Sequence, residues 1–153
     1  MVDFDHISEN INKRKYRLIG SGSGRLVFDL DNGYVVKVAK NRRGIAQNVA
    51  EYNIAAMKSS DMFAKIIGIS ENSRYLVMEK AERIKSISDI WDYYHVNNNY
   101  ELFRLDILKD FGAKYNLLYG DLCRKSSWGF VNNKPKIIDY GFTRETKKYY
   151  SMF

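Results

Sequence analysis

Residues 119–141 read YGDLCRKSSWGFVNNKPKIIDYG, and the rest of the chain can be interpreted from them. Two acids, Asp121 and Asp139, each follow a short apolar run. Between them, residues 128–131 and 136–138 have the pattern of two short strands joined by a polar Asn-Asn-Lys-Pro turn. Such a hairpin would bring both carboxylates back to one end, where they would suit a divalent cation and a proton acceptor. Two aspartates that cap turn amides are an equally good interpretation of this stretch alone.

The composition is that of one folded domain or one compact two-lobed unit. The chain has 153 residues, of which 45% are hydrophobic and 14% aromatic, so it can bury a core. Its net charge of +7 suits acidic ligands such as nucleotides. The basic residues occur in short groups and do not form one basic face with interleaved aromatics. A nucleic-acid-binding domain is therefore the weakest interpretation of the charge.

The cysteine count and the hydropathy pattern bear on the compartment. Cys123 is the only cysteine, so an internal disulfide is excluded and a reducing compartment is expected. No apolar run approaches the length of a membrane span, and the N-terminus lacks a signal-peptide pattern. We therefore expect a cytoplasmic protein without membrane contact, and the compact size suggests a phage or microbial source.

A glycine-rich segment near the N-terminus lies between two predicted strands. Residues 16–20 begin a strand, the sequence GSGSG at residues 20–24 interrupts it, and residues 25–30 resume it. An Asp-Asn-Gly turn then leads to a third strand over residues 34–40. Glycines let backbone amides approach phosphate oxygens, whereas a flexible hairpin loop is the plain alternative.

Lys37 is a charged residue among apolar neighbours in this third strand. Strand alternation would allow the side chain to face outward on an exposed sheet face, whereas a functional lysine would point into the protein. Lys40 is a rival candidate, but its neighbours Asn41 and Arg42 mark the end of the strand.

A helix is predicted over residues 43–58. Its apolar residues Ile45, Val49, Tyr52 and Ala56 recur on one face, which is the pattern of a helix that packs on a core. Glu51 lies beside this stripe.

The remaining predicted elements complete a sheet and add a longer helix. Residues 63–68 and 75–78 have the pattern of two more strands, which makes five in all. Residues 101–115 have the pattern of a helix with a wide apolar face, which implies burial against more than one neighbour.

In chain order, the glycine segment, Lys37, Glu51, Asp121 and Asp139 resemble the motifs of the protein-kinase-like superfamily. The Gly-Asp-Leu form of the catalytic loop is similar to that of small-molecule and atypical kinases rather than ordinary protein kinases.

The resemblance implies an α+β fold in two lobes. Residues 1–78 would form the N-lobe, a five-stranded antiparallel sheet with one helix. Residues 79–153 would form the hinge and a truncated, mainly helical C-lobe that contains the catalytic-loop hairpin. The chain ends twelve residues after Gly141 and has no Ala-Pro-Glu segment, so the peptide-docking helices of ordinary protein kinases would be missing.

The resemblance also implies an ATP site between the lobes. Val27 would pack on the adenine, Met78 would be the gatekeeper, and the backbone of Glu79 and Ala81 would pair with the adenine edge. Arg25 stands where the family has its third glycine and is a candidate phosphate contact. The residues assigned to the nucleotide are Gly20, Ser21, Gly22, Ser23, Gly24, Arg25, Val27, Lys37, Met78, Glu79 and Ala81.

The catalytic roles follow from the same resemblance. Lys37, paired with Glu51, would steady the phosphates, and Asp121 would accept or orient the proton of an attacking hydroxyl. Asp139 would hold Mg²⁺, and Ser126 stands where the family has an asparagine as second metal ligand.

These roles imply a minimal ATP-dependent phosphotransferase that moves the γ-phosphate of Mg-ATP to a hydroxyl acceptor. The alternative is a pseudokinase that binds nucleotide, or none, and acts through a protein partner. Without further C-lobe helices, the predicted helix over residues 101–115 needs a cover. We expect a homodimer or another partner there, or a fold-back of the C-terminal apolar residues Tyr149, Tyr150, Met152 and Phe153.

Overall fold

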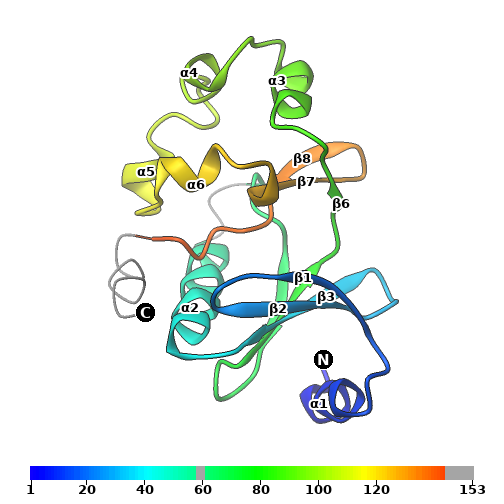
Figure 1. The fold of residues 1–153 in the computed structure, drawn as a ribbon. Helices are drawn as coiled ribbons and strands as arrows, with labels where there is room; N and C mark the ends of the chain where they lie inside the picture. The colour runs from blue at the N-terminus through cyan, green and yellow to red at the C-terminus, as the bar shows by residue number, and fades with distance from the viewer. Residues whose placement is uncertain (58–60, 144–153) are drawn as a thin grey trace.

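The computed structural model describes residues 1–57 and 61–143, which divide into two parts around two sheets (Figure 1). The first sheet has five antiparallel strands in the order β1-β2-β3-β5-β4. The second sheet has three strands in the order β6-β7-β8. The predicted α+β class and the five-stranded antiparallel sheet are confirmed. The chain passes from one sheet to the other between Glu79 and Glu82, beside the boundary expected after residue 78.

The elements of the first part are α1 (Phe4–Asn12), β1 (Arg17–Ser21), β2 (Arg25–Asp29), β3 (Tyr34–Ala39), α2 (Arg42–Ala56), β4 (Ile66–Ile69) and β5 (Tyr75–Glu79). The elements of the second part are β6 (Glu82–Arg83), α3 (Ser88–Tyr94), α4 (Asn99–Leu102), α5 (Phe111–Lys114), α6 (Tyr119–Leu122), the 3-10 turn η1 (Lys125–Ser127), β7 (Trp128–Val131) and β8 (Lys134–Ile137).

The turn between β2 and β3 sets the register of the first sheet. Asp31 and Gly33 have positive φ values of 57° and 88°, and glycine adopts such a backbone without strain. The carboxylate of Asp29 accepts a hydrogen bond from the amide of Asp31 at 2.9 Å, which tightens the turn. The resulting register places Val27 opposite Lys37.

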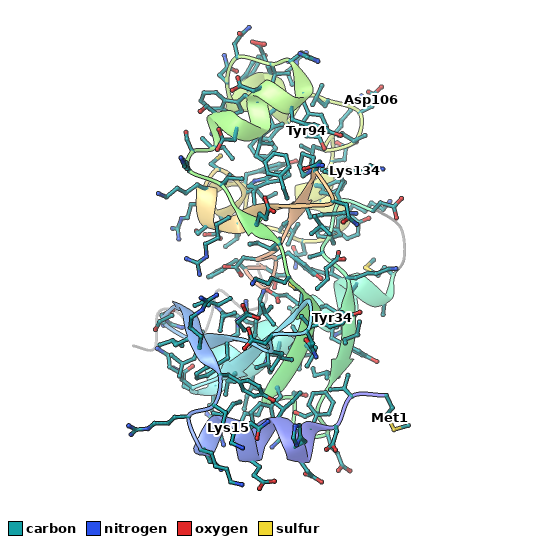
Figure 2. All side chains as sticks on the ribbon, turned by 90° about the vertical axis from the view of Figure 1, so that its right-hand side faces the viewer. Met1, Lys15, Tyr34, Tyr94, Asp106 and Lys134 are labelled. Carbon is teal, nitrogen blue, oxygen red and sulfur yellow. The ribbon has the colours of Figure 1, made fainter. Side chains whose placement is uncertain are left out.

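The two faces of the first sheet have different neighbours. On one face, α1 buries Ile7 against Val36, Val38 and Val77. Figures 1 and 2 show α1 at one end of the molecule and the second part at the other. Because side chains alternate along β3, Lys37 lies on the opposite face, which points toward the second part.

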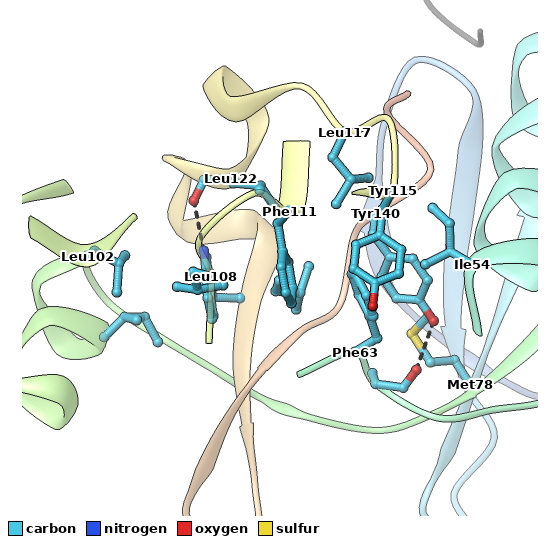
Figure 3. Close-up of a cluster of buried hydrophobic side chains, with 14 of the residues drawn as sticks. Ile54, Phe63, Met78, Leu102, Leu108, Phe111, Tyr115, Leu117, Leu122 and Tyr140 are labelled. Atoms are coloured by element: carbon cyan, nitrogen blue, oxygen red, sulfur yellow. Dashed lines mark hydrogen bonds between the residues drawn. The ribbon is translucent and has the colours of Figure 1, made fainter. Parts of the chain in front are cut away.

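A shared apolar core joins the two parts (Figure 3). Phe63 lies at its centre, with ring centroids 5.5 Å from Phe111, 4.9 Å from Tyr115 and 4.6 Å from Tyr140. Offset and edge-to-face arrangements of this kind stabilise a core beyond the area they bury. The hydroxyl of Tyr140 also donates to the carbonyl of Ala64 at 2.8 Å. The segment after β8 is therefore fixed to the chain that enters β4.

The predicted hairpin between the two aspartates is present as β7 and β8. The turn is shorter than expected, because only Asn132 and Asn133 form it, with φ values of 51° and 64°. Asparagine tolerates this left-handed backbone, and a two-residue turn of this kind matches the twist of an antiparallel pair. Pro135 belongs to β8, opposite Phe130.

The continuous helix predicted over residues 101–115 is wrong. Only its two ends are helical, and the chain between them makes turns with bonds such as Leu108 N to Leu105 O at 2.9 Å. Asp110 has a φ of 68°, a left-handed conformation that a continuing helix does not contain. Leu102 and Leu108 are nevertheless fully buried. The apolar pattern therefore marked Leu102 and Leu108 correctly as buried, but Ile107 is 44% exposed and the stretch is not one helix.

The apolar stripe predicted to pack α2 on the core is exposed instead. Ile45, Val49 and Tyr52 are 39%, 37% and 42% exposed. The opposite face of α2 is the buried one, and it carries polar residues such as Asn48 and Glu51. Hydrogen bonds satisfy Asn48, and ion pairs and hydrogen bonds satisfy Glu51, so these two side chains are buried without unpaired polar atoms.

Tyr149, Tyr150, Met152 and Phe153 lie outside the described residues, so the cover they were expected to provide stays a prediction. The expected homodimer stays a prediction as well, without the continuous helix on which it was based. Among the helices of the described ranges, none has both the length and the apolar character that a membrane crossing requires.

Candidate functional site

Four charged side chains from separate elements meet where the two parts of the molecule join. They are Arg25 of β2, Lys37 of β3, Glu51 of α2 and Asp139, which follows β8. Nζ of Lys37 lies 2.8 Å from Oε1 of Glu51. The guanidinium of Arg25 lies 2.7 Å from Glu51 and 2.9 Å from Asp139. Residues spread over most of the sequence therefore form one cluster of ion pairs.

Glu51 is the centre of this cluster and is fully buried. Beyond its ion pairs, it accepts hydrogen bonds from the backbone amides of Tyr140 at 3.1 Å and Gly141 at 2.9 Å. Burial by itself raises the pKa of Glu51, but the charges and hydrogen bonds of Arg25 and Lys37 outweigh burial and lower this pKa from 4.5 to about 2. Glu51 is thus ionised at neutral pH and ties α2 to the segment after β8.

The close packing of the segment after β8 on α2 explains the glycine at position 141. A Cβ at this position would lie 2.8 Å from the backbone oxygen of Gln47 in α2. A side chain would therefore push the segment away from α2 and lengthen the hydrogen bonds to Glu51.

Lys37 points into the protein, and the rival Lys40 is exposed at the end of β3. Besides its pair with Glu51, the ammonium of Lys37 donates to the carbonyl of Ile138 at 2.6 Å. Burial lowers the pKa of Lys37, and the charge of Glu51 partly offsets this. The lysine is held by two fixed acceptors, one from each part of the molecule, directly beside Asp139.

Asp139 is the candidate metal ligand. Burial raises its pKa, whereas the charges of Lys37 and Arg25 act in the opposite direction. A carboxylate is the oxygen ligand that Mg²⁺ takes together with substrate phosphates, so Asp139 fits one Mg²⁺ shared with a nucleotide. Within residues 1–57 and 61–143, no three His, Cys, Asp or Glu side chains gather as a metal site of their own. Ser126 is exposed on η1, and its role as a second ligand stays a prediction.

Ser127, the neighbour of Ser126, connects the two aspartate segments. Its hydroxyl donates to the carbonyl of Asp121 at 2.6 Å, and its own carbonyl accepts from the amide of Ile138 at 2.8 Å. The residue is buried, so these bonds are shielded from water. The hairpin therefore returns the chain beside α6, and the convergence of the Asp121 and Asp139 carboxylates stays a prediction.

Asp121 lies in α6, where Arg124 approaches it at 3.6 Å. Burial raises the pKa of the Asp121 carboxyl, and the charge of Arg124 partly counters this effect. The chain just before α6 also pairs with the segment after Asp139, because the amide of Leu118 donates to the carbonyl of Phe142 at 3.2 Å. A partly buried carboxylate with a raised pKa is suited to accept a proton.

The glycine segment has an exposed tip and a buried base. Ser21, Gly22 and Ser23 are exposed, and a Cβ at Gly22 would meet nothing within 4 Å. Gly24 is buried instead against the first turn of α2, where a Cβ would lie 3.0 Å from the amide of Gly44. The tip is therefore open to a phosphate ligand, while Gly24 serves to dock the hairpin on α2.

The predicted hinge connects the two sheets. Met78 is buried in the shared core, and Glu79 exchanges hydrogen bonds with Lys65, through its amide at 2.9 Å and its carboxylate at 2.7 Å. Ala81 packs against Gly129 of β7, where a Cβ would lie only 2.7 Å from the Ala81 methyl group. The chain between Glu79 and Ala81 is thus fixed from both sides.

Solved structures share this architecture. A streptomycin–ATP–APH(2″)-IIa ternary complex aligns with 92% of this chain and 73% of its own chain, at a TM-score of 0.51 and 17% sequence identity. The chain has the protein-kinase-like fold. The ADP-bound aminoglycoside phosphotransferase APH(2″)-Ib aligns with 89% of this kinase-like chain and 70% of its own, at a TM-score of 0.50 and 16% identity. No protein-family model and no curated protein sequence matches the chain. At these identities the likeness establishes the fold.

Sequence reasoning missed the inward orientation of Arg25 and the roles of Asn48 and Ser127. Arg25 was expected to be near phosphate, but its guanidinium binds Glu51, Asp139 and Asn48. The signal that was available for Asn48 is its position three residues before Glu51, which places both on one helix face. No feature of the sequence distinguished the structural role of Ser127 from that of its neighbour Ser126.

Proposed function

We propose that this kinase-like chain is a minimal phosphotransferase that moves the γ-phosphate of Mg-ATP to a hydroxyl acceptor. The observation that carries the proposal is the buried Lys37–Glu51 pair beside Asp139, because a lysine fixed in this way is positioned for nucleotide phosphates. The ATP-bound and ADP-bound neighbours support a nucleotide in the same site.

The phosphate end of the site would use groups from both parts of the molecule. Lys37 would donate to phosphate oxygens, and the amides of the exposed tip formed by Ser21, Gly22 and Ser23 would approach them from the other side. Asp139 would hold Mg²⁺, which when bound neutralises charge on the phosphate oxygens. Such positioning and charge neutralisation account for most of the catalysis in phosphoryl transfer.

The adenine end would be formed by the hinge. Val27 is half-buried on β2 and would pack on the ring, with Met78 behind it. Backbone groups of Glu79 and Ala81 would pair with the adenine edge. These contacts depend on the backbone, so they tolerate side chains without a recognisable motif.

Asp121 would accept or orient the proton of the attacking hydroxyl, since its carboxylate is partly buried and its pKa is raised. The acceptor is a hydroxyl of a small molecule or a protein. Aminoglycosides are the first acceptors to test, because the solved neighbours are phosphotransferases for them.

ATP consumption by the wild type and by Asp121→Asn tests the proposal. We expect the substitution to lower the rate by about 100-fold or more, as for the loss of a general base. Asp106→Asn is a matched control, because Asp106 is an exposed aspartate in a turn away from the cluster. If the wild type consumes no ATP with any of the acceptors tested, the proposed phosphotransferase activity is contradicted.

One observation favours the alternative, a pseudokinase that binds nucleotide and acts through a protein partner. Arg25 already holds an oxygen of Asp139, which an active enzyme would use for metal. If the wild type and Asp121→Asn are equally inert while ATP still raises the melting temperature, the pseudokinase replaces the enzyme.

A further inference from the structure

Arg25 is the most unusual residue of the site. It begins β2 directly after the glycine segment, and its side chain turns inward, so that only 6% of the residue is exposed. The guanidinium donates to Asn48 at 3.0 Å, to the two oxygens of Glu51 at 2.9 Å and 2.7 Å, and to Oδ1 of Asp139 at 2.9 Å. A positively charged side chain of the protein itself therefore contacts Asp139, the candidate metal ligand.

Glu51 and Asn48 hold this guanidinium in addition to its contact with Asp139. Two parallel bonds to Glu51 fix its plane, which is the strongest geometry that arginine makes with a carboxylate. Asn48 is itself held in place, because its amide donates to the carbonyls of Ser73 and Arg74. The guanidinium is thus a fixed charge that meets Asp139 from a preformed support.

The charges of the cluster cancel without any added ion. Arg25 and Lys37 are positive, and Glu51 and Asp139 are negative. An unpaired carboxylate beside a polyphosphate would repel it, and a divalent cation ordinarily removes that repulsion by binding both. In this chain the guanidinium of Arg25 already cancels the charge of Asp139.

We propose that Arg25 is the internal counter-ion of Asp139, so that nucleoside di- and triphosphates bind here with little dependence on a divalent cation. The inference rests on the proposed function only in that it requires a nucleotide in this site. It concerns the binding step, and it leaves open a need for Mg²⁺ in the transfer of phosphate.

Calorimetric titration with ADP, in MgCl₂ and in EDTA, tests the inference. In the wild type, removal of Mg²⁺ is expected to weaken ADP binding by less than about fivefold, the lower end of typical coupling between ligands. In Arg25→Gln, which keeps hydrogen-bond donors but loses the charge, removal of Mg²⁺ should weaken binding by about 50-fold or more.

Two further variants make the result specific to Arg25. Arg17→Gln is the matched control, because Arg17 is an exposed β1 arginine paired with Asp29, and it should behave as the wild type. Arg25→Lys keeps the charge without the paired bonds to Glu51, so its dependence on Mg²⁺ should fall between those of the wild type and Arg25→Gln. If Arg25→Gln does not fold, the comparison of the wild type with Arg25→Lys still tests whether Arg25 lowers the dependence of ADP binding on Mg²⁺.

The outcomes separate this inference from the proposed function. Wild-type binding that requires Mg²⁺ overturns the inference and leaves the phosphotransferase standing. Binding without Mg²⁺ in both the wild type and Arg25→Gln also overturns it, because Arg25 would then not be the cause. The absence of ADP binding under either condition overturns both the inference and the proposed function.

Discussion

Lys37 and Glu51 form an ion pair of 2.8 Å although they lie on a strand and a helix 14 positions apart. Both side chains are buried. Glu51 also forms an ion pair with Arg25 and accepts hydrogen bonds from two backbone amides of the segment after Asp139. The pair therefore joins the first sheet, α2 and the second part of the molecule at one point. Its integrity affects stability as well as the site.

Glu51→Gln should destabilise the fold strongly, because Arg25 and Lys37 would remain buried with one carboxylate fewer. We expect a loss of about 3–5 kcal/mol in the free energy of unfolding, as for other broken buried pairs. Urea unfolding measures it. Glu9→Gln is the control, since Glu9 forms an exposed pair with Lys13 and should cost less than about 1 kcal/mol. Equal losses in the two variants would show that the buried cluster is not structural.

Acid should unfold the protein partly through Glu51. Its pKa is lowered to about 2 in the folded chain from an ordinary 4.5. The stabilisation is therefore fully present above pH 4.5 and is lost as the pH falls from there toward 2. Urea unfolding at a series of pH values should show this decline in the wild type and a shallower one in Glu51→Gln. A wild-type stability that stays constant across this range would refute the assignment.

Gly44→Ala should destabilise the contact between the glycine segment and α2. A Cβ at Gly44 would overlap the backbone oxygen of Gly24, so the hairpin must move. Overpacking of this kind costs about 1–3 kcal/mol. Gly22→Ala is the matched control because the space around Gly22 is open, and its melting temperature should equal that of the wild type. Equal melting temperatures of Gly44→Ala and Gly22→Ala would contradict the close contact between the glycine segment and α2.

Ser127→Ala should weaken the link between the two aspartate segments. The loss of its hydrogen bond to Asp121 should cost about 1 kcal/mol, and a shift of Asp121 should lower any phosphotransfer rate. Ser126→Ala removes the same hydroxyl one residue earlier, on the exposed side of η1, and should leave stability unchanged. If Ser126→Ala instead alters the Mg²⁺ dependence of phosphotransfer, Ser126 is a metal ligand after all.

Much of the fold could be predicted because its strands obey local rules. The Asp-Asn-Gly turn fixes the β2–β3 hairpin, and the paired asparagines fix the β7–β8 hairpin, so both are encoded within a few residues. The chain order of Lys37, Glu51 and the two aspartates indicated the kinase-like fold. The resemblance depends on the order in which these residues follow one another along the chain, and that order can be read from the sequence.

Two expectations failed because burial on α2 and near α5 does not follow apolar periodicity. The buried face of α2 is set by the need of Glu51 to meet Lys37 and Arg25, so Ile45 and its apolar neighbours on the same stripe are left outside. In residues 101–115, Leu102 and Phe111 are buried from short helices and Leu108 from a turn, whereas Ile107 is exposed. The left-handed Asp110 prevents a continuous helix. Both outcomes depend on tertiary contacts that a periodic pattern does not contain.

The orientation of Arg25 could not be predicted for a related reason. Its position in the glycine segment suggested a phosphate contact, whereas its bonds to Glu51 and Asp139 span 26 and 114 positions of sequence. Only the folded arrangement of β2, α2 and the segment after β8 brings these groups together.

The central claim is that a nucleotide binds beside Lys37, between the first sheet and Asp139. Titration of ADP into the wild type, Lys37→Met and Lys40→Met tests it most directly, because Lys40 is an exposed lysine on the same strand end. The account predicts that Lys37→Met weakens binding by about tenfold or more, as for a lost hydrogen bond to a charged group, and that Lys40→Met binds as the wild type does. Equal affinity of a folded Lys37→Met and the wild type, or no binding by the wild type, would contradict it.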